Sequence, residues 1–209
     1  MVPVSAETGA SVTVVSDYRF RGVSLSDEQP SAQLNFTYDN YDGWYAGATL
    51  AGVKLAHSSP QGQVLTYFGY ARREASGLSW ETGATVVGFT DDSDYSYGEV
   101  YAGFSTSFWN ARLYFSPDYY GLGERTGYAE LNAQYPLNAS VRLFGHVGGL
   151  GALGGAHGTR VDTRAGASVG MDRWELAVTW GAVVGSVRPY APVYENHHQS
   201  WVLSAALFF

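Results

Sequence analysis

Apolar and polar residues alternate along much of this chain, and this alternation restricts its possible folds more than any other feature. The last segment shows it clearly, because Trp201, Leu203, Ala205, Leu207 and Phe209 occupy every second position. Successive side chains of a β-strand point to opposite faces, so such a run predicts a strand with one apolar face. Similar runs recur throughout, and the sequence therefore predicts an all-β protein.

Twelve such segments can be recognised, and the connections between them alternate in length. The predicted strands cover 8–19, 31–39, 44–54, 62–73, 78–89, 96–106, 111–119, 125–134, 139–148, 159–169, 173–186 and 198–209. Short turns fall near 40–43, 74–77, 107–110, 135–138 and 170–172, and longer loops near 20–30, 55–61, 90–95, 120–124, 149–158 and 187–197. An even number of strands, with short turns at one end and long loops at the other, is typical of outer-membrane barrels.

The sequence therefore predicts a 12-stranded antiparallel up-and-down transmembrane β-barrel, with both termini at the short-turn end. We expect a single barrel domain over residues 8–209. Residues 1–7 are interpreted as an N-terminal tail, left by a tag or by a cleaved signal peptide. The glycine-rich stretch from Gly145 to Gly158 is interpreted as part of a flexible external loop.

The apolar faces can point inward, as in a soluble barrel, or outward toward lipid, and three observations favour lipid. Twelve strands enclose a lumen too wide for one layer of apolar side chains to fill. Aromatic residues lie near the strand ends, where the interfacial girdles of a membrane barrel lie. The polar faces carry charges of both signs, and an arginine at the bilayer midplane costs roughly 2–4 kcal/mol.

Composition excludes several other classes of protein. The net charge is −7, with acidic residues clustered in predicted loops such as Asp91, Asp92 and Asp94, so no nucleic-acid partner is expected. The chain contains no cysteine, which excludes disulfides and thiolate metal sites. No apolar run approaches the ~18 residues of a membrane helix. We expect neither a cofactor nor a metal site.

Two motifs resemble a known family. The first is SDYRFRGVS at 16–24, followed by Ser26-Asp27 and by QPSAQ at 29–33, and the second is YGEVYAG at 97–103. Both are similar to the TorF-type porins of proteobacteria. Members of that family often carry a Tyr-Tyr-Pro-like stretch before the second motif, whereas this chain has VVGFT at 86–90. The resemblance implies an outer-membrane barrel more firmly than it implies a substrate.

Polar side chains on the inward faces are interpreted as the lining or the constriction of a pore. Asp17, Arg19 and Arg21 would alternate inward on the first strand, with Gln33 and Asn35 beside them on the second. Fixed charges at a constriction select small solutes by size and sign. The same residues are equally consistent with a charge network that braces the barrel wall. The other predicted lining residues are Glu99, Arg112, Tyr114, Glu130, Arg142, Arg160, Asp162 and Arg164.

We therefore predict an outer-membrane channel for the passive diffusion of small polar solutes. One alternative is a closed barrel with a structural or adhesive role. Another is a barrel enzyme that uses His146, His197, His198 or Asp92, but their spacing fits no catalytic mechanism, so we expect no enzyme. The expected partners are the lipid bilayer, lipopolysaccharide and small polar solutes. A monomer is expected, and Phe209 resembles the C-terminal aromatic residue through which Gram-negative outer-membrane barrels bind the barrel-assembly machinery.

Overall fold

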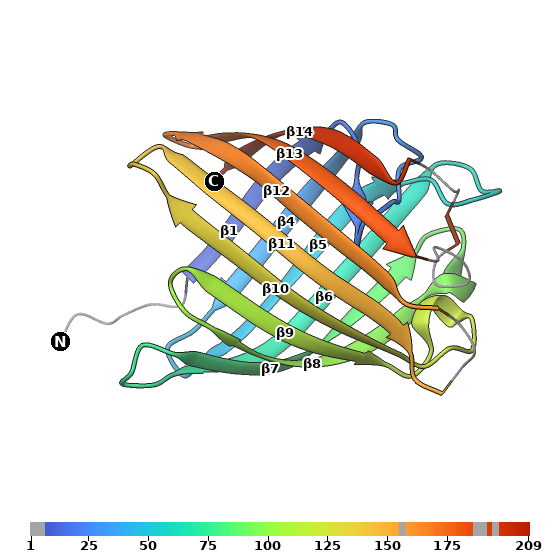
Figure 1. Ribbon diagram of the computed structural model, residues 1–209, viewed down its shortest axis with the longest axis horizontal. Coiled ribbons are helices and arrows are strands. Elements are labelled where there is room, and N and C mark those ends of the chain that lie inside the picture. Colours follow the sequence, from blue (N-terminus) through green and yellow to red (C-terminus); the bar gives the residue numbers. More distant parts are fainter. Residues whose placement is uncertain (1–6, 155–157, 186–191, 194–196) are drawn as a thin grey trace.

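The structure is a computed structural model that describes residues 7–154, 158–185, 192–193 and 197–209. Twelve strands close into one antiparallel barrel, in which consecutive strands pair and the first strand pairs with the last (Figure 1). This confirms the predicted twelve-stranded fold. The barrel strands are β1 (Glu7–Val15), β4 (Ser31–Asp39), β5 (Trp44–Val53), β6 (Gln61–Arg73), β7 (Ser79–Phe89), β8 (Tyr97–Ser105), β9 (Trp109–Ser116), β10 (Thr126–Pro136), β11 (Val141–Ala152), β12 (Arg160–Met171), β13 (Trp174–Gly185) and β14 (Gln199–Phe208).

The two ends of the barrel differ in the length of their connections. The start of β1 and the end of β14 lie at the end with short turns, and the long loops lie at the opposite end (Figure 1). Two 3-10 helices, η1 (Ser93–Tyr95) and η2 (Tyr119–Gly121), lie in these long loops. Within the described ranges, no helix has the length and apolarity needed to cross a membrane.

The outer face of the barrel is apolar, and the inner face carries the charges, as the sequence predicts. Leu113 on β9 and Leu203 on β14 are 67% and 63% exposed, whereas Glu99 on β8 and Asp162 on β12 are 4% and 1% exposed. A continuous apolar exterior is unfavourable in water and favourable in hydrocarbon. The wall is therefore built to face lipid.

The largest departure from the sequence prediction follows β1. This strand ends at Val15, which pairs with Ser31 at the start of β4, so the predicted strand over 8–19 is too long. The intervening residues 16–30, which we call the plug, fold back into the lumen and do not form the predicted external loop at 20–30. Within the plug, the short strands β2 (Arg19–Phe20) and β3 (Val23–Ser24) form a hairpin.

The turn of this hairpin explains how the plug reaches the barrel wall. Arg21 and Gly22 have φ angles of 47° and 81°. Positive φ at both central residues is typical of a type I′ turn, in which glycine is favoured at the second position. A Cβ atom at Gly22 would lie 2.7 Å from the Cβ of Asp162 and 3.0 Å from the Cβ of Val183. Only glycine therefore allows this turn to pack so closely against β12 and β13.

Apolar side chains fill the long-loop end of the lumen, although the polar inward faces of the strands predict a water-filled interior. Leu25 of the plug packs in one cluster with Leu55, Tyr119, Tyr120 and Leu150, each of which is at most 1% exposed. We call this cluster the upper core. Burying one large apolar side chain contributes about 1.5–3 kcal/mol, so the plug is held by apolar packing as well as by charge.

Several predicted boundaries also shift. Strand β11 continues to Ala152, so the first part of the predicted glycine-rich loop at 149–158 is strand. Strand β9 begins and ends earlier than the predicted 111–119. Most of the predicted loop at 187–197 lies outside the described residues, as do residues 1–6 of the predicted tail, and Glu7 belongs to β1.

Candidate functional site

A polar cavity of about 700 Å³ occupies the short-turn half of the lumen, and the plug forms its inner end. We call this cavity the vestibule. Its volume lies within the range of small-molecule sites in proteins. Positive and negative groups balance in its lining, which includes Arg19, Arg21, Arg112 and Arg164 as well as Asp39, Glu81, Glu99 and Glu130.

Tyrosine rings line the vestibule beside glycines on the neighbouring strands. Tyr45 pairs with Gly69, and Tyr101 pairs with Gly83. A Cβ atom at Gly69 would lie 2.5 Å from Cζ of Tyr45, and one at Gly83 would lie 2.5 Å from Oη of Tyr101. Because glycine has no side chain, each tyrosine ring can lie against the neighbouring strand, and the vestibule stays open.

Arg21, at the tip of the plug, is bound to strand β8. Its Nη1 and Nη2 atoms donate to the Glu99 carboxylate at 2.8 and 2.7 Å, and both side chains are buried. The guanidinium also lies 4.1 Å from the ring centroid of Tyr128 and 5.0 Å from that of Tyr114. A bidentate carboxylate and aromatic faces are both favourable partners for arginine. These contacts pin the plug across the lumen.

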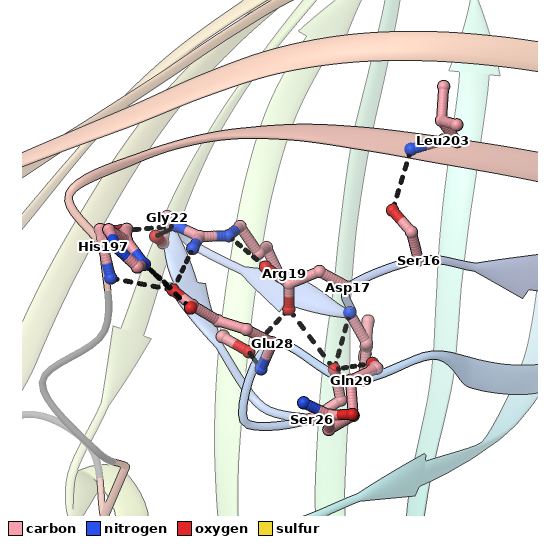
Figure 2. A network of polar contacts seen from close by, with 11 residues as sticks. Ser16, Asp17, Arg19, Gly22, Ser26, Glu28, Gln29, His197 and Leu203 are labelled. Carbon is pink, nitrogen blue, oxygen red and sulfur yellow. Dashed lines mark hydrogen bonds and ion pairs between the residues drawn. The ribbon is translucent and has the colours of Figure 1, made fainter.

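Asp17 and Arg19 brace the plug internally. Arg19 Nε donates to Asp17 Oδ2 at 2.6 Å, and Arg19 Nη1 donates to the Gly22 carbonyl at 3.2 Å (Figure 2). The other carboxylate oxygen of Asp17 accepts a hydrogen bond from Ser24 Oγ at 2.6 Å. The predicted placement of these charges on the first barrel strand is wrong because β1 ends before them. They nevertheless lie in the lumen, where they brace the plug; Arg19 borders the vestibule, and Asp17 borders a smaller cavity between the plug and the wall.

A second set of contacts joins the plug to the last long loop. His197 donates to Glu28 from its backbone N at 2.8 Å and from Nδ1 at 2.8 Å, and Arg19 Nη2 donates to the same carboxylate at 3.2 Å (Figure 2). We call these three residues the latch. Burial raises the pKa of Glu28, but the hydrogen bonds from His197 and the charge of Arg19 outweigh it, so this pKa lies below its usual value.

His146 points into the lumen from β11 and has three side-chain partners. Its Nε2 lies 2.8 Å from Asp162 Oδ1 and 3.2 Å from Tyr128 Oη, and its Nδ1 lies 2.7 Å from Asn132 Oδ1. The buried Asp162 also accepts a hydrogen bond from the Tyr128 hydroxyl at 3.1 Å. This network joins three strands of the wall below the plug.

The residues considered for an enzyme have separate partners. His146 belongs to the network with Asp162, His197 belongs to the latch, and Asp92 accepts a hydrogen bond from Gln61. In the part of the chain that the structure describes, no group of three or more His, Cys, Asp or Glu residues is arranged to hold a metal ion.

Arg160, predicted to line the pore, is instead fully buried beside the upper core. Among the residues that the structure describes, its three guanidinium nitrogens have no hydrogen-bond partner, and neither do the hydroxyls of Tyr97, Tyr119 and Tyr120. Burying a charged group without a partner is costly. We therefore expect Arg160 to lower the stability of this part of the barrel, and it does not line the vestibule.

The remaining predicted lining residues lie at different depths. Gln33 borders a side cavity of about 240 Å³ between the plug and the wall. Asn35 lies further toward the short-turn end, where its Nδ2 donates to Ser11 Oγ at 3.3 Å, so it is not beside Arg21 as predicted. Arg142 on β11 forms an ion pair with Glu175 on β13, across the intervening strand β12, near the same end.

Cross-strand pairs of inward side chains complete the vestibule wall. Arg112 donates to the Glu81 carboxylate at 2.7 and 3.2 Å, and the Tyr114 hydroxyl donates to Glu130 at 3.2 Å. Sequence reasoning missed Glu81, although Trp80 on the outward face indicates that its neighbour points inward. It also missed that Tyr119 and Tyr120 of η2 belong to the upper core, because loop residues carry no periodic signal.

The closed barrel and its polar lumen define a class of fold, that of the outer-membrane porins. The KdgM porin matches with a TM-score of 0.65 at 9% identity, over 96% of this chain and 99% of that chain. The NanC porin matches with a TM-score of 0.58 at 9% identity, over 95% and 98% of the two chains. An outer membrane channel from Pseudomonas putida F1 matches with a TM-score of 0.54 at 12% identity, over 100% and 96%. At these identities the likeness concerns the fold alone.

The sequence itself shows the family. Residues 3–203 match the model of Gcw_chp, described as a bacterial protein of unknown function, and the chain therefore belongs to the Gcw_chp family. A comparison with curated proteins finds no match. The finer resemblance to TorF-type porins stays a prediction.

Proposed function

We propose that this protein is an outer-membrane channel for the passive diffusion of small polar solutes, and that its plug closes the long-loop end in the state described here. The observation that carries the proposal is the vestibule, a charged cavity of about 700 Å³ inside an apolar-walled barrel. The vestibule ends at the plug, which polar contacts and the upper core attach to the wall. Diffusion through such a lumen needs neither a cofactor nor an energy source. Release of the plug would join the vestibule to the long-loop side.

A solved structure with a similar fold supports a polar solute. One of the matching structures is described as the KdgM porin in complex with disordered oligogalacturonate, at 9% identity and a TM-score of 0.59. A barrel of the same architecture therefore accommodates a polar saccharide. For this chain we propose only the broader class of small polar solutes, because the lining residues are its own.

The proposed location is the bacterial outer membrane, with the short turns on the periplasmic side. The apolar exterior would contact the bilayer and lipopolysaccharide, and the chain would act as a monomer without an enzymatic role. Phe209, which is 70% exposed and whose backbone N donates to the Ala10 carbonyl at 3.0 Å, would present the C-terminal aromatic ring to the barrel-assembly machinery.

Conductance across planar bilayers tests the proposed function. Glu99→Gln removes the charge that holds Arg21, which should free the plug and increase single-channel conductance or open probability several-fold over the wild type. Glu74→Gln, in an exposed short turn, is the matched control and should leave conductance unchanged. Equal conductance of the wild type and both variants would contradict a plug-gated channel.

The upper core favours a second candidate, a permanently closed barrel with a structural or adhesive role. The long-loop end is packed with side chains that have almost no exposure, among them Leu25 and Leu150. For this candidate, no conductance would appear even after the plug is detached from Glu99. The same bilayer experiment therefore separates the two functions.

A further inference from the structure

We infer that the lumen holds a binding site for a small hydroxylated carboxylate, centred on Arg164. This inference rests on the proposed function, because a solute must enter the lumen to reach the site. Arg164 projects inward from β12 and is exposed within the lumen. Among the residues that the structure describes, no hydrogen bond or ion pair involves its side chain. By contrast, carboxylates pair with Arg19, Arg21, Arg112 and Arg142.

Arg164 stands where three cavities meet. It lines the vestibule, the side cavity next to the plug, and a third cavity of about 280 Å³ near the short-turn end, which we call the recess. The lining of the recess contains no carboxylate. Unlike the balanced vestibule, the recess is therefore a place where a positive group faces a ligand without competition from an acidic side chain.

Other donors and the Phe144 ring contribute to the recess. Asn110 Oδ1 accepts a hydrogen bond from Asn132 Nδ2 at 3.0 Å, which leaves the Nδ2 group of Asn110 available as a donor. The Thr179 hydroxyl, on the opposite side of Arg164, also lines the recess. The Phe144 ring lies over Gly166, where a Cβ atom would be 2.5 Å from Cζ of the ring. The recess thus offers polar donors beside an apolar face.

The chemistry of these groups selects the class of ligand. The guanidinium fork of an unpaired arginine matches the two oxygens of a carboxylate. Amide and hydroxyl groups suit the hydroxyls of the same molecule, and an aromatic face suits its C–H groups. A volume of about 280 Å³ fits a single small solute and excludes a polymer held entirely within the recess.

Direct binding to the detergent-solubilised protein tests this inference independently of conductance. Saturation-transfer NMR with sodium gluconate should show binding, and sorbitol, which lacks the carboxylate, should bind at least about tenfold more weakly. Acetate, which lacks the hydroxyls, should also bind more weakly than gluconate. Equal binding of gluconate and sorbitol would overturn the inference even if the protein conducts ions.

Two lumen variants and one outer variant locate the site. Arg164→Gln should weaken gluconate binding about tenfold or more, whereas Arg72→Gln, at the exposed short-turn end of β6, should leave it unchanged. Asn110→Asp keeps the oxygen that accepts from Asn132 but adds a negative charge to the recess, so it should abolish binding with the barrel intact. Unchanged binding in Arg164→Gln or in Asn110→Asp would show that the recess is not the site.

Discussion

At the scale of single residues, the inward arginines differ in how their charges are satisfied. Arg21 has a bidentate carboxylate and aromatic neighbours, whereas Arg160 is fully buried and its guanidinium nitrogens have no hydrogen-bond partner within the described ranges. A buried charge stabilises a fold only when its partners offset the loss of hydration. We therefore expect the two residues to make opposite contributions to the stability of the same barrel.

Replacing Arg160 with methionine should stabilise the protein. Methionine has a similar length and no charge, so the free energy of unfolding should rise by about 1–4 kcal/mol. The midpoint of heat-induced unfolding, followed by the mobility shift of the barrel in gel electrophoresis, measures this change. Arg142→Met is the control, because it breaks a half-exposed ion pair and should change stability by less than about 1 kcal/mol. A lower midpoint for Arg160→Met would show that its guanidinium has a bound partner.

The alternation of residues predicts which side chains point inward, but not their partners. It places Arg112, Glu130 and Arg164 on the inner face because strand periodicity is a local property. The pairing of Arg21 with Glu99 joins residues 78 positions apart, and it depends on a turn that reverses the chain inside the lumen. The inward face of the site residues on the barrel strands was therefore predictable, while the plug that organises the site was not.

At the scale of elements, the plug is the segment whose position decides whether the lumen is open. Strands β1 and β4 pair from Glu7–Asp39 up to Val15–Ser31, so the barrel closes without any contribution from residues 16–30. The plug is attached by the ion pair at its tip, by the upper core and by the latch. Because the latch is the most exposed of these attachments, it is the one that solution conditions can change.

Acid should weaken the latch. The pKa of Glu28 is lower when the latch is formed, so the ionised carboxylate stabilises the latch. This stabilisation is complete above the usual glutamate pKa of about 4.3, and it is lost as the pH falls through the lowered pKa. The open probability of the channel in bilayers should therefore rise below about pH 4. The Glu28→Gln variant should show this higher open probability already at about pH 7. A Glu28→Gln channel that behaves as the wild type at both pH values would contradict a role of the latch in gating.

At the scale of the whole molecule, the account depends on which face of the barrel is apolar. Large apolar side chains such as Leu34, Leu113 and Trp201 are exposed on the outside, while charged groups such as Glu99 and Asp162 lie within. The sequence predicted this arrangement because a twelve-stranded lumen is too wide to fill with one apolar layer. The long-loop end is nevertheless packed, since loops and the plug supply side chains that strand periodicity does not describe.

Placing a charge on the outer wall should impair membrane insertion. Leu113→Arg, near the middle of β9, should destabilise the barrel in lipid by roughly 2–4 kcal/mol, whereas Leu113→Ala should cost less because it adds no charge. Folding into vesicles at increasing urea concentration measures both effects. Equal stability of the two variants would indicate that Leu113 does not face hydrocarbon.

The central claim is that a membrane channel is closed from within by residues 16–30. Because Val15 and Ser31 are paired neighbours, a short Asn-Gly turn can replace the whole plug and leave the barrel closed. Single-channel conductance of this variant in planar bilayers is the most direct measurement. The account predicts a conductance several-fold above that of the wild type, with brief or absent closures. A plug-free barrel that folds, inserts and passes no more current than the wild type would contradict it.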